Sequence, residues 1–321
     1  MEGIVKLKVS EQQLNHALLQ VYGCNAVAIS ELTDGWANSA YEVLMQDGKS
    51  YIVKVSPAQS TKLMRYEYEM MKTEVEVLNL LQQVNGIPIP KVIAYDRSRQ
   101  LLQGEFFMME KLPGQPYNKV KDQLSAEERH TIEIELGQYN SAINEVKGTT
   151  FGYFNAKKNE QSSWRDAFLL MINGVLDDGE DSQLPLSIPY DELRQILNKR
   201  SYCLSEVIVP SLVHWDLWDG NFFVEHGKIT GIIDFERALW GDPLIEHYFS
   251  NKANSKSFVE GYGKYEQLTH NERQRLAYYN LYLDLIMYIE CAFRGYTNKD
   301  HVEWAKRNVA EGIATFMEQS N

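Results

Sequence analysis

Cysteine is scarce in this chain of 321 residues. The three cysteines, Cys24, Cys203 and Cys291, are an odd number and show no C-x-x-C spacing. This usage argues against a disulfide framework and gives no zinc-binding pattern. Reduced thiols of this kind are typical of the cytoplasm, which is the location we expect for the protein.

Long apolar runs are also missing. The N-terminal segment MEGIVKLKVSEQQ lacks the apolar stretch of a secretory signal. The longest apolar-looking run, LYLDLIMYIECAF, has 13 residues and contains Asp284 and Glu290. It is too short and too charged to cross a bilayer, so we expect no membrane association.

Basic residues are outnumbered, with 32 Lys+Arg against 44 Asp+Glu and a formal net charge of −12. A nucleic-acid backbone is therefore not an expected partner. Residues 1–112 hold 11 Lys+Arg and 13 Asp+Glu, which leaves −10 of the −12 in residues 113–321. Most such charge is simply solvated, but it makes a cationic ligand somewhat more favourable than a neutral one.

The first third of the chain has the pattern of strands with two helices. A helix is predicted from Ser10, a typical N-cap residue, through SEQQLNHALLQVYG. The turn QDGKS between YEVLM and YIVKV predicts a β-hairpin. Met70, Val77 and Leu81 recur at helical spacing, and Gly86 is the expected end of that helix. IPIPKVIAYD and GEFFMMEKLPG read as two further strands.

From Gly114 onward the pattern is mainly helical. Four segments show helical apolar spacing: LSAEERHTIEIELGQYNSAINEV, SSWRDAFLLMINGVL, YDELRQILNKRSYCL and NERQRLAYYNLYLDLIMYIECAFRGY. The exception is a pair of short strands in NFFVEHGKITGIID. We therefore predict an α+β chain of two lobes, with a strand-rich lobe over residues 1–112 and a mainly helical lobe over residues 113–321.

Polar residues concentrate in VHWDLWDGNFFV, residues 213–224. Burying carboxylates is costly without a partner, so either this stretch is an exposed turn or a cation belongs there. Asp216 and Asn221, joined by Asp234 at the end of a later apolar run, suit Mg²⁺, which takes one or two carboxylates and leaves its other positions to water and phosphates. Asp216 is then placed to meet an acceptor hydroxyl.

The first third supplies residues of complementary chemistry. Lys54 is the lone charged residue in the strand YIVKV, where it is either an edge lysine or a phosphate ligand. Glu74 lies on the following helix and can hold that lysine, with Glu69 and Glu76 as rivals on the same helix. The turn DGWANS can present backbone N–H groups to phosphate oxygens. These features together indicate phosphoryl transfer.

Five motifs, through their order along the chain and their spacing, resemble those of the aminoglycoside phosphotransferase family, small-molecule kinases that share the protein-kinase fold. VHWDLWDGN is similar to the family's HxDxxxxN loop, and IIDFERALWGDP to its second metal-binding motif. YIVKV and TEVEVLNLL are similar to its strand lysine and helix glutamate, and FFMMEKLPG to its adenine-binding linker. The resemblance implies a protein-kinase-like two-lobe fold with ATP and Mg²⁺ as cofactors.

The resemblance also implies roles for individual residues. Asp216 would be the catalytic base, and Asn221 and Asp234 would bind Mg²⁺. The remaining residues would hold the nucleotide. These are Gly35 and Asn38 over the phosphates, Lys54 with its partner Glu74, Met109 behind the adenine, and Glu110 and Leu112, whose backbone groups would bind the adenine.

Several positions depart from the family pattern or have simpler explanations. Trp215 stands where the family usually has glycine, and Glu236 replaces the glycine of the kinase DFG motif. His214 is interpreted as a residue that braces the loop, and Glu246 as structural. Asp219 is interpreted as a solvated or capping turn residue, with a substrate contact as the alternative.

The predicted function is ATP- and Mg²⁺-dependent phosphorylation of a small-molecule hydroxyl, on an aminoglycoside-like antibiotic, an amino alcohol or a sugar derivative. The alternatives are transfer of AMP onto a protein and non-catalytic nucleotide binding. No oligomeric state is inferred. The acceptor pocket is expected in the helical lobe, where the candidates are Trp164, Asp166, Asp177, Asp178 and Glu290.

Overall fold

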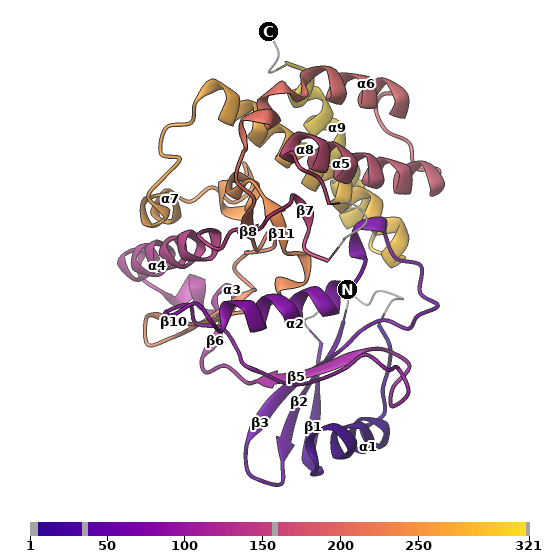
Figure 1. The fold of residues 1–321 in the computed structure, drawn as a ribbon, viewed down its shortest axis with the longest axis vertical. Helices are drawn as coiled ribbons and strands as arrows, with labels where there is room; N and C mark the ends of the chain where they lie inside the picture. The colour runs from indigo at the N-terminus through magenta and orange to yellow at the C-terminus, as the bar shows by residue number, and fades with distance from the viewer. Residues whose placement is uncertain (1–5, 34–37, 156–159, 319–321) are drawn as a thin grey trace.

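The computed structural model describes residues 6–33, 38–155 and 160–318 (Figure 1). A β-sheet occupies one end of the molecule and most of the helices lie at the other, with α2 between them (Figure 1). This confirms the predicted α+β arrangement of two lobes.

The N-terminal lobe is built on a five-stranded antiparallel sheet of order β1-β2-β3-β5-β4. Its strands are β1 Ala26–Leu32, β2 Ser39–Met45, β3 Ser50–Val55, β4 Val92–Asp96 and β5 Phe106–Glu110. Because successive side chains in a strand point to opposite faces, β5 contributes to two cores. Phe106 and Met108 join a core with α1 (Glu11–Tyr22), whereas Phe107 and Met109 join the larger core that contains α2 and the C-terminal helices. Both helices were predicted.

The same alternation directs β3 toward the space between the lobes. Val53 and Val55 belong to the core with α1. Ile52 packs against the larger core, so Lys54, two residues further on, lies on the face that is turned toward α2 and the helical lobe.

Helix α2 (Met70–Leu81) ends five residues before the predicted stop at Gly86. Residues 82–86 form turns, and Gly86, with φ +90°, belongs to them. The apolar spacing carried no signal for the earlier end, because the helix stops where the chain must bend toward β4.

The C-terminal lobe is mainly helical, as predicted. Its helices are α3 Tyr117–Val120, α4 Ala126–Asn144, α5 Trp164–Asp181, α6 Tyr190–Arg200, α7 Lys256–Tyr262, α8 His270–Arg294 and α9 Lys299–Glu318. Its strands are β6 Gln115–Pro116, β7 Gly152–Tyr153, β8 Ser211–Val213, β9 Phe222–Glu225, β10 Lys228–Ile232 and β11 Leu239–Gly241. The β9–β10 hairpin was predicted, and β6 adds a third strand to it.

A second small sheet, of order β7-β11-β8, was not predicted. Its strands have two or three residues each, too few for an alternating pattern to show. Within the described parts of the chain, no helix combines the length and the apolar character that a bilayer crossing requires.

Candidate active site

The loop between β8 and β9, residues 214–221, is held from inside by His214. This side chain is fully buried, and its Nδ1 accepts a hydrogen bond from the backbone N–H of Asp216 at 3.2 Å. A backbone N–H only donates, so Nε2 carries the ring proton and donates it to the carbonyl of Ile233 at 2.8 Å. Burial lowers the pKa of His214, which favours the neutral ring. The residue braces the loop, as interpreted from the sequence.

Glu246 fixes the same loop from the other side. Its buried carboxylate accepts hydrogen bonds from the backbone N–H groups of Trp215 at 3.0 Å and Leu217 at 3.2 Å. Trp215 has φ +64°, a left-handed conformation that costs a bulky residue on the order of 1–3 kcal/mol. Its ring stacks on Tyr282 with centroids 5.4 Å apart. The charged hydrogen bonds and this packing hold the strained backbone in place.

Replacement of Glu246 by alanine is therefore expected to lower the free energy of unfolding by at least about 2 kcal/mol, because it leaves two buried N–H groups without an acceptor. Denaturant unfolding measures this loss, with the exposed Glu260→Ala on α7 as control. Equal stability of the two variants would show that Glu246 does not support the loop.

Asp216 lies at the centre of this loop and is half-buried. Burial raises the pKa of its carboxyl group to about 7. The positive charge of Arg237 opposes this rise in pKa, whereas the negative charge of Asp234 adds to it. Asn221 donates from its side-chain amide to the Asp216 carbonyl at 2.8 Å. The amide oxygen is thus the atom that Asn221 can offer to a metal ion.

Lys54 contacts one carboxylate of its own lobe and one of the helical lobe. Its Nζ lies 2.6 Å from Glu74 Oε1 and 2.8 Å from Asp234 Oδ1. Burial opposes ionisation of Asp234, but the charge of Lys54 overcomes it and lowers the pKa. Burial raises the pKa of Glu74 to about 7 in spite of Lys54. Of the rival carboxylates, Glu69 contacts Arg97 at 2.6 Å and Glu76 lies 3.6 Å from Lys72, so Glu74 is the partner of Lys54.

Glu236 is a third carboxylate at this point, and its proximity to the other two was not predicted from the sequence. Glu74, Asp234 and Glu236 each offer an oxygen within 4.8 Å of the others. Burial and the nearby charge of Asp234 raise the pKa of Glu236 to about 8. Asn38 donates to Glu236 Oε2 at 2.6 Å. The available signal was its position two residues after Asp234, which we interpreted only as a departure from the kinase motif.

The charge at this point fits a divalent cation. Three carboxylates face one ammonium group, and Glu74 Oε2 is buried without a hydrogen-bond partner among the described residues. Asp234 has φ +70°, a left-handed conformation that aspartate tolerates and that redirects the chain sharply. Oxygen ligands of this kind are those that Mg²⁺ prefers.

The linker after β5 packs against the β9–β10 hairpin. Met109 is buried on the face of the sheet that is turned toward the helical lobe. The backbone N–H of Glu110 donates to Lys91 at 3.0 Å, which leaves its carbonyl as the group it can offer to a base. Leu112 packs so closely on Gly231 that a Cβ there would lie 2.3 Å from the leucine. Gly35, the other predicted nucleotide contact, lies outside the described residues.

Asp219 lies in a turn, as interpreted from the sequence, but its carboxylate is engaged by other side chains and does not cap a helix. It pairs with Lys121 at 2.8 Å and accepts from the Tyr248 hydroxyl, and its carbonyl accepts from the Asn118 N–H at 2.9 Å. It tethers the catalytic loop to the segment that follows the linker.

The acceptor-pocket candidates lie apart from one another. Trp164 is buried and donates to Tyr279, while Asp166 lies at the start of α5 next to its cap, Ser163. Asp178 pairs with Arg65, and Asp177 with Arg194. Glu290, which contacts Arg237 at 3.3 Å, is the one whose charge influences Asp216.

The fold and this arrangement of lysine, carboxylates and catalytic loop define a phosphotransferase with a protein-kinase-like fold. The chain matches the phosphotransferase enzyme family over residues 28–279, so it belongs to that family and is an enzyme of this class. No curated protein matches it.

Solved structures show the same fold at low sequence identity. The fructosamine-3-kinase candidate of Haemophilus somnus 129PT is 19% identical, covers 94% of this chain and 97% of its own, and has a TM-score of 0.67. A thermostable mutant of aminoglycoside phosphotransferase APH(4)-Ia, in a ternary complex with ADP and hygromycin B, is 18% identical over 94% of this chain and 98% of its own, also with a TM-score of 0.67.

Proposed function

We propose that this enzyme transfers the γ-phosphate of ATP, in a Mg²⁺-dependent reaction, to a hydroxyl group of a small molecule. The observation that carries the proposal is the contact of Lys54 with both Glu74 and Asp234, the latter just after the β9–β10 hairpin that follows the loop holding Asp216. Nucleotide binding by a structural neighbour, crystallised with ADP and hygromycin B, supports it.

Each residue has a part in the proposed reaction. Asp216 accepts the proton of the acceptor hydroxyl as the oxygen attacks phosphorus, and the leaving group is ADP. Lys54 binds the phosphates and is kept in place by Glu74. Bound Mg²⁺ would neutralise the phosphate charge, held by Asp234 with Asn221 and Glu236 as further ligands.

Nucleotide binding is proposed for the linker and the turn before β2. The Glu110 carbonyl and the backbone of Leu112 would bind the adenine against Met109, and Gly35 and Asn38 would lie over the phosphates. We likewise propose that the lobes divide at residues 112 and 113 and that the enzyme acts in the cytoplasm. The cysteine thiols, all of them free, are consistent with that location.

Lys54→Met is expected to lower kcat/KM by roughly 10- to 150-fold, because a charge-assisted phosphate contact is worth about 1.5–3 kcal/mol. Methionine keeps most of the stem volume. Lys49→Met, an exposed lysine on the same hairpin, serves as control. An unchanged kcat/KM together with a lowered melting temperature would make Lys54 a structural residue only.

A coupled assay of ADP release tests the proposed function across sugars, amino alcohols and aminoglycosides. We expect at least one class to stimulate ADP release above the rate with ATP alone. Release of pyrophosphate instead of ADP would favour AMP transfer. Tight ATP binding without any product would favour a nucleotide-binding module.

A further inference from the structure

A polar cavity of about 670 Å³ lies beside the loop that holds Asp216, residues 214–221, which we call the catalytic loop. One wall is formed by Trp218 and Asp219, which follow Asp216 closely in the chain. The other walls come from residues 118–133 and from residues 247–257, the segment that leads into α7. Small-molecule sites commonly have volumes of about 300–1,000 Å³. The cavity therefore has the size of a small-molecule site, and one of its walls begins two residues after Asp216 in the chain.

The carboxylates that line this cavity already have partners. Asp219 is bound by Lys121 and by the Tyr248 hydroxyl. Glu133 accepts hydrogen bonds from the hydroxyls of Tyr117, at 3.1 Å, and Ser255. An acceptor with several ammonium groups would have to displace these contacts, so the cavity does not offer the open carboxylates that a polycation needs.

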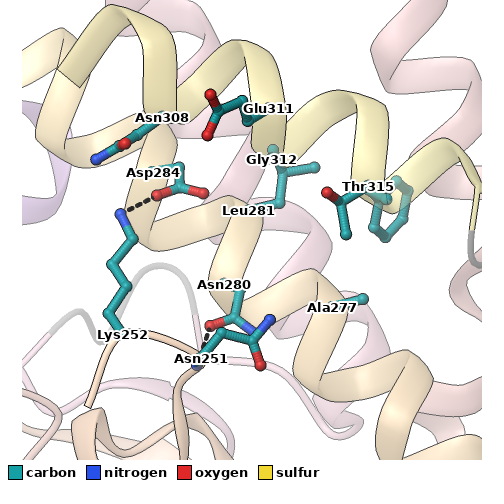
Figure 2. A pocket seen from close by; sticks show the side chains of 11 residues that line it. Asn251, Lys252, Ala277, Asn280, Leu281, Asp284, Asn308, Glu311, Gly312 and Thr315 are labelled. Carbon is teal, nitrogen blue, oxygen red and sulfur yellow. Dashed lines mark hydrogen bonds and ion pairs between the residues drawn. The ribbon is translucent and has the colours of Figure 1, made fainter. Parts of the chain in front are cut away.

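Its three lysines add little net charge. Lys121 is neutralised by Asp219. Lys252 turns away into an adjoining cavity of about 160 Å³, where its ammonium group contacts Asp284 between α8 and α9 (Figure 2). Lys121 also lies 3.9 Å from Glu133. Lys256 has no carboxylate within 4.0 Å among the residues that the structure describes, and its single positive charge brings the remaining positive charges of the lining level with the negative ones. The cavity is thus close to neutral, unlike residues 113–321 as a whole.

The remaining lining is suited to hydroxyl groups. The side-chain amides of Asn118, Asn251 and Asn254 both donate and accept hydrogen bonds. The half-buried Trp218 adds a flat apolar surface next to them. Asn251 and Lys252 line both cavities, so the larger cavity adjoins the smaller one between α8 and α9.

We propose that this cavity binds the acceptor, and that the acceptor is an uncharged polyhydroxylated molecule, a sugar or polyol, rather than a polycation. The inference rests on the proposed function, and it narrows the acceptor classes that the sequence left open. A neutral acceptor differs from the cationic acceptor that the acidic charge of residues 113–321 favoured, because the excess of acidic residues does not lie at this cavity.

Binding can be tested without turnover through the fluorescence of Trp218. The full-length protein with ADP·Mg²⁺, which has no γ-phosphate to transfer, is titrated with a panel of neutral sugars and polyols and with the aminoglycoside kanamycin, and Trp218→Phe identifies the response of this residue. We expect a neutral compound to give a Trp218-dependent change at lower concentration than kanamycin does. Tighter binding of kanamycin, or no Trp218-dependent change with any neutral compound, would overturn the inference.

A blocking variant tests the same site in the kinetic assay. Ala253→Trp fills the cavity from the 247–257 segment and is expected to raise the acceptor KM at least tenfold, with the KM for ATP unchanged. Gln12→Trp, an exposed position on α1, is the control. An unchanged acceptor KM would show that the acceptor binds outside this cavity, and it would not contradict the proposed kinase activity. A Trp218 response without any ADP formation would instead reject the proposed function and keep the binding site.

Salt dependence provides an independent check. Exposed charges interact over about 10 Å at 0.1 M ionic strength, so salt weakens the binding of a polycation. The KM of the best neutral acceptor is expected to change less than about twofold when salt is added at this level. A steep rise in its KM would contradict a neutral site.

Discussion

Asp216→Asn is expected to reduce turnover by at least about 10²-fold, the lower end of the contribution of a general base. Asparagine preserves the size and the hydrogen-bonding capacity of the side chain, but it cannot take the proton of the acceptor hydroxyl. The surrounding loop should keep its shape, because His214 contacts the backbone of Asp216 and Glu246 contacts the backbone on either side.

Nucleotide affinity separates this effect from a structural one. Since Asp216 is proposed to face the hydroxyl, ATP·Mg²⁺ should bind to Asp216→Asn nearly as tightly as to the wild type in calorimetry. Turnover at the wild-type rate would reject the mechanism. A combined loss of ATP binding and of thermal stability would show that Asp216 supports the loop and is not the base.

Asp234→Ala is expected to weaken ATP·Mg²⁺ binding at least tenfold, about 1.4 kcal/mol, and to lower kcat/KM by roughly 10²–10³-fold. Asp234 is the carboxylate that is shared between Lys54 and the group of possible metal ligands. Its loss removes one of the two partners of Lys54 and the carboxylate that we propose as a Mg²⁺ ligand. Binding of ATP without metal should change much less, because the linker offers backbone groups.

Glu236→Gln provides a graded comparison. If Glu236 is a further ligand, this variant should require more Mg²⁺ for half-maximal activity. Its loss of kcat/KM should be smaller than that of Asp234→Ala. The exposed Asp300→Ala at the start of α9 is the control for charge removal. Wild-type affinity of Asp234→Ala for ATP·Mg²⁺ would show that the metal assignment is wrong.

The parts of the site that follow from local periodicity could be predicted from the sequence. Lys54 is the charged residue of an alternating strand, and the alternation alone places it opposite the face of Val53 and Val55. Glu74 follows from helical spacing, since it is buried on the same face of α2 as Val77 and Leu78. Local pattern is enough where one element sets the direction of a side chain.

Contacts between distant segments could not be predicted in this way. Glu236 lies with Glu74 and Asp234 in one group of carboxylates, and the left-handed conformation of Asp234 beside it has no signature in the sequence. Asp219 is tethered by Lys121, 98 residues earlier in the chain. The near-neutral charge of the cavity also depends on ion pairs between residues that are distant in the sequence. The net negative charge of residues 113–321 favoured a cationic acceptor instead.

The most direct measurement of the central claim follows the phosphate itself. The enzyme is incubated with Mg²⁺, a panel of small hydroxyl compounds and ATP labelled at the γ-phosphate, with Asp216→Asn as the blank. We predict that label appears on one class of small molecule, that one ADP forms for each phosphate transferred, and that the blank is nearly inactive. No transfer of this label to any compound at a rate above the blank, or transfer of label only in a parallel incubation with ATP labelled at the α-phosphate, would contradict a small-molecule kinase.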